Sequence, residues 1–192
     1  MAVLLILAPF GAFTLLMLVS SAAVSLFVAA AICLFVIALD AARGRSIKIL
    51  GAGSTIVFAG IGSYLVFIDP SLSGSAVKIA VDGGVLLITL GSMLLRHPFT
   101  LQYALEGVPS ETAAIPGFLR ANYVITGAWA LATILMMAGN LVMIYVPGLP
   151  FWTGLAVAFA ARNSALYFTR WYPDYRKAKD ALAQAGALAE TH

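Results

Sequence analysis

Residues 23–39, AVSLFVAAAICLFVIAL, form an unbroken apolar stretch without a single charged side chain. A helix that crosses a lipid bilayer needs about 20 mostly apolar residues. Polar residues bound the stretch on both sides, with Ser20 and Ser21 before it and Asp40 and Arg43 after it. The stretch therefore predicts a transmembrane helix with short connections at both ends.

Comparable apolar stretches recur along the chain, and together they predict six spans. The spans cover residues 3–19, 23–39, 49–68, 76–95, 122–145 and 151–168. The 192 residues are 62% hydrophobic and only 10% charged, with a mean hydropathy of +1.00, whereas soluble domains carry about 25% charged residues. We predict an all-α integral membrane protein, a bundle of six transmembrane helices in three hairpins. Residues 1–171 form the membrane domain, and the alanine-rich residues 172–192 form a tail with a surface helix.

The basic residues predict the orientation of this bundle. Nine of the 11 lie in the second-to-third connection, the fourth-to-fifth connection and the tail, which are all on one side of a six-span protein: Arg43, Arg45, Lys48, Arg96, Arg120, Arg170, Arg176, Lys177 and Lys179. Because Lys and Arg accumulate in cytoplasmic loops, both termini are predicted to be cytoplasmic. We therefore interpret the net charge of +3 as a sign of orientation in the membrane. The expected partners are membrane lipids, and nucleic-acid binding is not expected.

Small residues recur every three or four positions on two predicted helices. They are Gly51, Thr55, Ala59 and Gly62 in the third span, and Gly154, Ala158, Ala161 and Ala165 in the sixth. Helices in lipid associate through close packing at such residues. The stripes predict packing seams within the bundle, and a homodimer face is the alternative.

A polar cluster is predicted within the membrane. Its residues are Lys78 and Asp82 on the fourth span, Asn140 on the fifth, and Arg162 and Asn163 on the sixth. A charge at the bilayer centre costs about 2.5–3.5 kcal/mol unless it is partnered. Two interpretations stay open: a polar cavity of a transporter or channel, and a structural ion pair between Asp82 and Arg162 with Asn140 satisfying nearby groups.

No catalytic or metal-binding pattern is found in the sequence. Cys33 is the single cysteine, and the two histidines, His97 and His192, are far apart. No nucleophile elbow, zinc-protease motif or phosphate-binding loop is present. We therefore expect no enzyme activity, no cofactor and no metal.

The connection that follows the fourth predicted span begins with Arg96 and residues 97–102, HPFTLQ. Pro98 can start a helix, and Phe99 and Tyr103 are four residues apart, so they lie on one helix face. An interfacial helix with Arg96 at the lipid headgroups is one interpretation. A docking site for a partner protein, in which Gln102 takes part, is the other.

From this connection onward the chain resembles the intracellular septation protein A family of bacterial inner-membrane proteins. The similar stretches are residues 97–102, Ala128-Trp129, Gly139-Asn140, Pro147 and residues 167–173, YFTRWYP. The resemblance implies a polytopic protein of the bacterial inner membrane, linked to cell division and to the cell envelope, without known catalysis. It also marks Gln102, Trp129, Asn140 and Arg170 as positions to test.

Two functions are therefore predicted. The first is a non-enzymatic scaffold or accessory subunit that contacts partner proteins through the fourth-to-fifth connection and the tail. The second is a small transporter or channel that uses the polar residues of the last three spans.

Overall fold

In the computed structural model, which describes residues 2–146, 148–150 and 152–189, the chain forms helices and no strands. The helices of this described part are α1 (Ala2–Val19), α2 (Ala22–Ala42), α3 (Ile49–Phe67), α4 (Gly74–Leu94), α5 (Phe99–Ala104), α6 (Ser110–Ala113), α7 (Pro116–Tyr145) and α8 (Trp152–Ala189). The prediction of an all-helical protein is confirmed over these residues. Pro147, the predicted start of the last span at Phe151, and His192 lie outside them.

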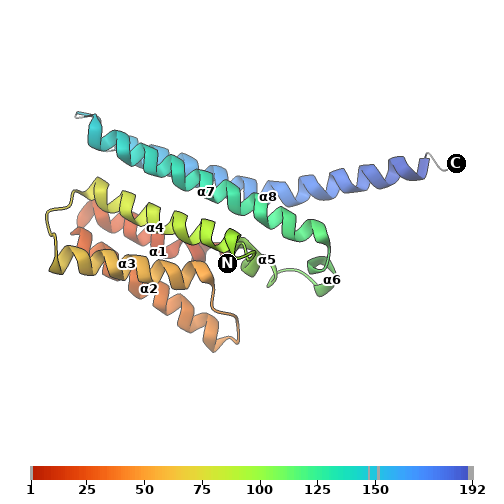
Figure 1. Ribbon diagram of the computed structural model, residues 1–192, viewed down its shortest axis with the longest axis horizontal. Helices are drawn as coiled ribbons and strands as arrows, with labels where there is room; N and C mark the ends of the chain where they lie inside the picture. Colours follow the sequence, from red (N-terminus) through yellow and green to blue (C-terminus); the bar gives the residue numbers. More distant parts are fainter. Residues whose placement is uncertain (1, 147, 151, 190–192) are drawn as a thin grey trace.

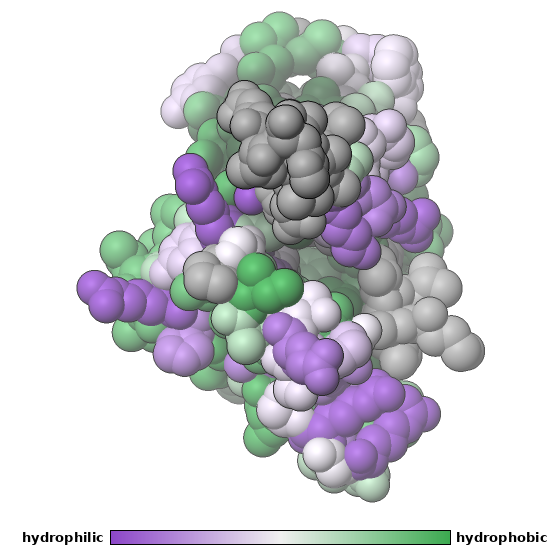
Figure 2. Space-filling model, turned by 90° about the vertical axis from the view of Figure 1, so that its right-hand side faces the viewer, coloured by the Kyte–Doolittle hydropathy of each residue, from purple (hydrophilic) through white to green (hydrophobic). Residues whose placement is uncertain are grey.

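The long helices run up and down beside one another as three hairpins (Figure 1). The turns α1–α2, α3–α4 and α7–α8 lie at one end of the bundle. The α2–α3 connection, α5 and α6 lie at the opposite end, which we call the basic end because it carries Arg43, Arg96 and Arg120. Figure 2 views this end, where many hydrophilic residues gather. The basic residues of the second-to-third and fourth-to-fifth connections therefore lie at the same end of the fold.

Each long helix packs on the next one along the chain, and α4 packs on α7. The larger core lies among α1 to α4 and includes Phe13, Leu26, Phe58 and Val77, all buried. The rings of Phe13 and Phe58 lie 5.5 Å apart between centroids. A smaller core between α7 and α8 is built from Ala132, Met136, Ala161 and Ala165. The α4–α7 contact joins the two parts.

Four helices are long and apolar enough to cross a membrane: Ala22–Ala42, Ile49–Phe67, Gly74–Leu94 and Gly117–Tyr145. Within α1, the segment Ile6–Val19 is also apolar. Large apolar side chains face outward, with Ile56 exposed by 74% and Phe159 of α8 by 72%. An outward apolar surface of this kind suits lipid as the solvent. Crossing by α1 and α8, and hence the count of six spans, stays a prediction.

Two helices are longer than the sequence pattern indicates. Helix α7 begins at Pro116, six residues before the predicted start at Asn122. Proline suits this first position, since its missing N–H would have no partner inside the helix. Helix α8 does not end at Phe168 but continues through Pro173 to Ala189, so the tail is not a separate helix.

Aromatic residues stack along α8 where it passes through Pro173, which lacks an N–H to donate within the helix. Phe168 stacks on Tyr172 at 5.1 Å between ring centroids, and Trp171 stacks on Tyr175 at 4.9 Å. Residues four apart on a helix lie one above the other, so the Trp171–Tyr175 pair spans the proline and the Phe168–Tyr172 pair ends just before it. These contacts offset part of the cost of the missing hydrogen bond.

Close approach of the backbones fixes the seams between helices. On α3, Gly51 lies against Ile37 and Gly62 against Phe27, so the predicted small-residue stripe faces α2. On α8, Ala158, Ala161 and Ala165 pack on α7. Both predicted seams are therefore packing seams within the bundle.

Gly84 is the tightest position between α3 and α4, and we expect Gly84→Ala to lower the free energy of unfolding by about 1–3 kcal/mol. A Cβ added there would lie 2.6 Å from Cγ1 and 2.7 Å from Cγ2 of Val57, so the two helices must move apart. Unfolding in mixed detergent micelles, followed by circular dichroism, measures the change.

The same helix supplies the control, since a Cβ added at Gly91 meets nothing within 4 Å. Gly91→Ala should be neutral or stabilising by up to about 1 kcal/mol. Adding Val57→Ala to Gly84→Ala should restore much of the loss because it makes room for the new methyl. A loss that Val57→Ala leaves unchanged would contradict steric overlap as the cause.

Candidate functional site

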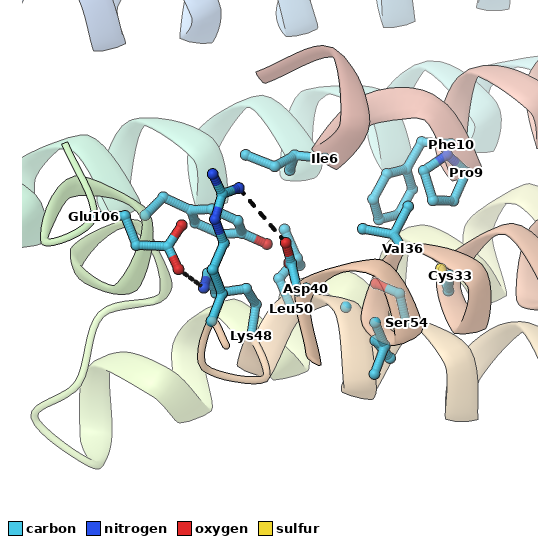
Figure 3. Close-up of a pocket in the computed structure, with 14 residues that line it drawn as sticks. Ile6, Pro9, Phe10, Cys33, Val36, Asp40, Lys48, Leu50, Ser54 and Glu106 are labelled. Atoms are coloured by element: carbon cyan, nitrogen blue, oxygen red, sulfur yellow. Dashed lines mark hydrogen bonds and ion pairs between the residues drawn. The ribbon is translucent and has the colours of Figure 1, made fainter. Parts of the chain in front are cut away.

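A buried lysine lies at the basic end where α2, α3 and α5 meet (Figure 3). Lys48 immediately precedes α3 and is only 4% exposed. Its ammonium forms an ion pair with Glu106, which follows α5, and donates hydrogen bonds to the carbonyl oxygen of Ser46 at 2.8 Å and to its Oγ at 3.2 Å. A buried charge needs such partners, since desolvation costs several kcal/mol. The pair ties the fourth-to-fifth connection to the start of α3.

Tyr103 completes this cluster. The Lys48 Nζ lies 5.8 Å from the centroid of its ring, within the range of a cation–π contact. Burial, and to a smaller extent the charges of Asp40 and Glu106, raises the pKa of Tyr103 above its ordinary value. The phenol therefore stays neutral at physiological pH, and it serves here as a packing and cation-binding group.

The cavity beside this cluster is small, about 40 Å³. The ion pair of Asp40 with Arg45, at 3.7 Å, lies at its polar side, and Cys33 and Ser54 lie deeper (Figure 3). The Ser54 hydroxyl is buried and has no hydrogen-bond partner in the described part of the chain. A cavity of this size has room for water but not for a substrate or cofactor. The cluster is therefore a structural anchor.

Helix α5 is fixed to three other helices by hydrogen bonds. The Gln102 Oε1 accepts from the backbone N–H of Ile49 at 2.7 Å, so it caps the start of α3, where no local side chain does so. The backbone N–H of Phe99 donates to Ser92 Oγ at 3.1 Å. Thr100 donates to the carbonyl oxygen of Asn122 on α7 at 3.0 Å. The HPFTLQ stretch thus attaches the connection to the bundle.

This attachment decides which predicted contact residues can meet a partner or lipid. Phe99 is 6% exposed and packs edge-on to Tyr103 at 6.5 Å between centroids. Phe99 therefore points into the bundle, and Gln102 is engaged with α3. Arg96 is exposed. Of the predicted contact set, Arg96 is the side chain that the fold presents to the surroundings.

Arg96 has an unusual backbone conformation, with φ at 59°. Its N–H donates to the carbonyl oxygen of Met93 at 3.0 Å, and the N–H of His97 donates to that of Ser92 at 2.9 Å. These two bonds form a Schellman motif, which usually has glycine at the left-handed position. The motif ends α4 sharply and turns the chain toward α5.

The structure brings Asp82, Asn140 and Arg162 together between α4, α7 and α8. The Asn140 Nδ2 donates to Asp82 Oδ2 at 3.1 Å, and Asn140 is 7% exposed. The positive charges of Arg162 and, more weakly, Lys78 act on Asp82. The ion pairs found among the described residues do not include Asp82 with Arg162, so their attraction acts over more than 4 Å. The closest polar partner of Asp82 is Asn140.

Asn163 does not belong to this group. It is exposed, and its Nδ2 donates to the carbonyl oxygen of Phe159 in its own helix at 2.7 Å. Consecutive helical residues point about 100° apart, so Arg162 and Asn163 cannot share one face. Neither of the cavities described here is lined by the polar cluster. The predicted polar cavity, with Asp82, Asn140, Arg162 and Asn163 on its walls, is therefore neither of these two cavities, and Asn163 faces away from the other residues.

A much larger groove of about 700 Å³ opens at the basic end. We call it the basic-end groove. Its walls come from the start of α1, from α5 and α6, from the first half of α7 and from the middle of α8. Ligand pockets typically have volumes of about 300–1,000 Å³. By size, this groove is the candidate binding site of the described structure.

Several residues singled out in the sequence meet at this groove. Trp129 lies at its inner end and donates from Nε1 to Thr169 Oγ1 on α8 at 3.0 Å. Arg170 follows on the same helix and also lines the groove. Thr100 lines it from α5. Three of the stretches that carry the family resemblance therefore converge on one surface.

No family model, curated protein or solved structure matches the chain at a significant level. The comparisons leave the resemblance to the septation family as a prediction. The case for function therefore rests on the groove, the anchored connection and the long last helix.

Sequence reasoning did not find the Lys48–Glu106 pair. The sequence pattern places Lys48 among the basic residues of the second-to-third connection and does not mark Glu106. The two lie 58 positions apart, so no local spacing links them. The one local signal is that Lys48 sits directly between apolar residues, Ile47 and Ile49. Apolar neighbours favour burial of Lys48 but do not indicate which residue forms an ion pair with it.

Proposed function

We propose that this chain is a six-span protein of the bacterial inner membrane, with its basic end in the cytoplasm, that acts without catalysis as a scaffold or accessory subunit in cell-envelope or septation processes. The observation that carries the proposal is the last helix. Residues 172–189 continue α8 by about 27 Å at 1.5 Å per residue, and this part extends past the other helices (Figure 1). It offers a partner a rigid arm.

The side chains near the start of this arm suit protein contact. Trp171 and Tyr175 are exposed aromatic residues, and Lys177 and Lys179 add charge. Aromatic residues are enriched at protein interfaces. In the fourth-to-fifth connection, Glu106 and Gln102 instead contact residues of the bundle itself. The arm is therefore the main surface that we expect a partner protein to contact. The Lys and Arg residues of the basic end support its location in the cytoplasm, because these residues accumulate on the cytoplasmic side of membrane proteins.

Removing residues 174–192 tests the scaffold role, because it deletes Tyr175, Lys177 and Lys179 of the arm. We expect the truncated protein to keep its fold, because the two core clusters found among the described residues reach no further than Ala165. It should lose partner proteins in cross-linking and pull-down from membranes. A photo-cross-linking residue in place of Tyr175 should capture the partner, and one in place of Phe159 should capture lipid. Recovery of the same proteins with and without the arm would contradict the proposal.

A small transporter or channel is the second candidate. Its support is the contact of Asp82 with Asn140, near Arg162, within the apolar bundle. Ionisable groups inside membranes commonly mark ion or substrate pathways. Substitution of Asp82 separates this role from a structural one, because a transport role predicts a loss of flux and a structural role a loss of stability.

A further inference from the structure

The basic-end groove has an apolar inner part. Ile6 and Leu7 of α1, Ile125 and Trp129 of α7, and Leu166 of α8 line it. Two of its neutral polar side chains are already engaged: Thr100 donates to the Asn122 carbonyl, and the Asn122 side chain donates to the carbonyl oxygen of Phe118 at 2.9 Å. The inner part therefore offers an occupant apolar contact with little hydrogen bonding.

The charged lining residues all belong to α8. Arg170, Arg176 and Lys177 line the groove, and its described lining contains no acidic residue. Leu166, Thr169, Arg170, Pro173 and Lys177 follow a three-to-four-residue rhythm, so one face of α8 forms this wall. From Leu166 to Lys177 the wall spans about 16 Å at 1.5 Å per residue. It changes from apolar to positively charged toward the end of the molecule.

This gradient matches the chemistry of one class of occupant. Lys177 forms an exposed pair with Asp174 at 3.8 Å, a contact that contributes little in water. Arg170 forms no ion pair with a described residue. A molecule with a negative head and an apolar body would place the head at these cations and the body along Leu166 and Trp129. Basic pockets beside membrane helices bind anionic lipid headgroups in this way.

We propose that the basic-end groove binds an anionic glycerophospholipid of the surrounding bilayer, with its headgroup at Arg170 and Lys177 and part of an acyl chain along the apolar wall. The site goes beyond the scaffold role and requires only that the bundle lies in a membrane. A lipid is favoured over a soluble anion because most of the groove is apolar, and a free phosphate would leave that surface without contact.

The test uses the full-length protein reconstituted in nanodiscs that contain phosphatidylglycerol and phosphatidylcholine, followed by native mass spectrometry of the lipid that stays bound. We expect phosphatidylglycerol to be retained in preference to phosphatidylcholine. Arg170→Gln with Lys177→Gln should weaken retention roughly 30-fold, since each basic residue near anionic lipid contributes about fivefold. The matched control, Arg43→Gln with Lys179→Gln, removes two exposed charges of the same end outside the groove lining and should retain the lipid.

A second pair of variants tests the apolar wall. Ala121 lines the groove, so Ala121→Phe should displace the lipid, whereas Val124→Phe on the exposed side of α7 should not. Equal retention of both lipids, or equal loss in the groove and control variants, would overturn the proposal. Displacement of the lipid by millimolar inorganic phosphate would also overturn it, since the site would then recognise only the anion. None of these outcomes depends on a partner protein, so the scaffold proposal is tested separately.

Discussion

Glu106→Ala should lower the free energy of unfolding by about 2–3 kcal/mol, because it removes the carboxylate partner of the buried Lys48 while the Glu106 side chain itself is 29% exposed and partly screened by water. The Lys48 ammonium would then remain buried with only Ser46 and the Tyr103 ring around it. The connection through α5 would also lose one of its two bonds to the start of α3, and the hydrogen bond from the Ile49 N–H to Gln102 would remain. Unfolding of the purified protein in mixed micelles, followed by circular dichroism, measures the loss.

The double variant Lys48→Met with Glu106→Leu is the sharpest control. It replaces the buried pair by apolar side chains, a change that is often neutral or stabilising. It should therefore recover most of the stability that Glu106→Ala loses. Glu111 is exposed on α6, and Glu111→Ala should have little effect. A loss below about 1 kcal/mol for Glu106→Ala would mean that Lys48 reaches water, because pairs in water contribute about that much.

Asp82→Leu should lower the free energy of unfolding by about 2.5–3.5 kcal/mol, the cost of an unpartnered charge at the centre of a membrane helix. The substitution removes the negative charge that acts on Arg162 and the acceptor for Asn140. Asp82→Leu combined with Arg162→Leu should recover part of the loss because no uncompensated charge remains. Unfolding in the same micelles provides the comparison.

The control for Asp82 is Asp69, which lies in the α3–α4 turn and is partly exposed. Hydrogen bonds from the Ser71 hydroxyl and backbone N–H lower the pKa of Asp69, but its carboxylate faces water. Asp69→Asn should therefore leave the bundle stable. If Asp82→Asn also left the stability unchanged, the cluster would have no structural role, and flux measurements in vesicles would decide on transport. If Asp82→Asn changed neither stability nor flux, both interpretations of the cluster would fail.

The hairpin arrangement could be predicted because its signals are local. Apolar stretches such as residues 23–39 set the helices, and the basic residues between them set one end apart from the other. The long last helix could not be predicted from local rules, since Pro173 normally favours a helix end. The helix nevertheless continues, with aromatic pairs stacked before and across Pro173 that offset part of its cost, and only the folded helix shows them stacked.

The candidate sites divide in the same way. Asp82, Asn140 and Arg162 were predicted as a cluster because polar groups are costly in apolar helices, and the fold brings them together. Asn163 was predicted with them, but the 100° between neighbouring helical residues turns it outward. Arg170 and Trp129 were marked only by a family resemblance. Their common position at the groove follows from how α7 packs on α8.

By itself the sequence determined that this protein is a bundle of apolar helices with its positive charge at one end, because hydrophobicity and charge act through each residue's own side chain. Only the tertiary structure decided which side chains of the apolar residues 23–39 face the core: this stretch lies in α2, with Leu26 and Cys33 buried. It also decided that Lys48 meets Glu106, and that α1, α5, α7 and α8 enclose a groove. Such contacts join residues far apart in the chain, and their energy exists only once the helices have packed.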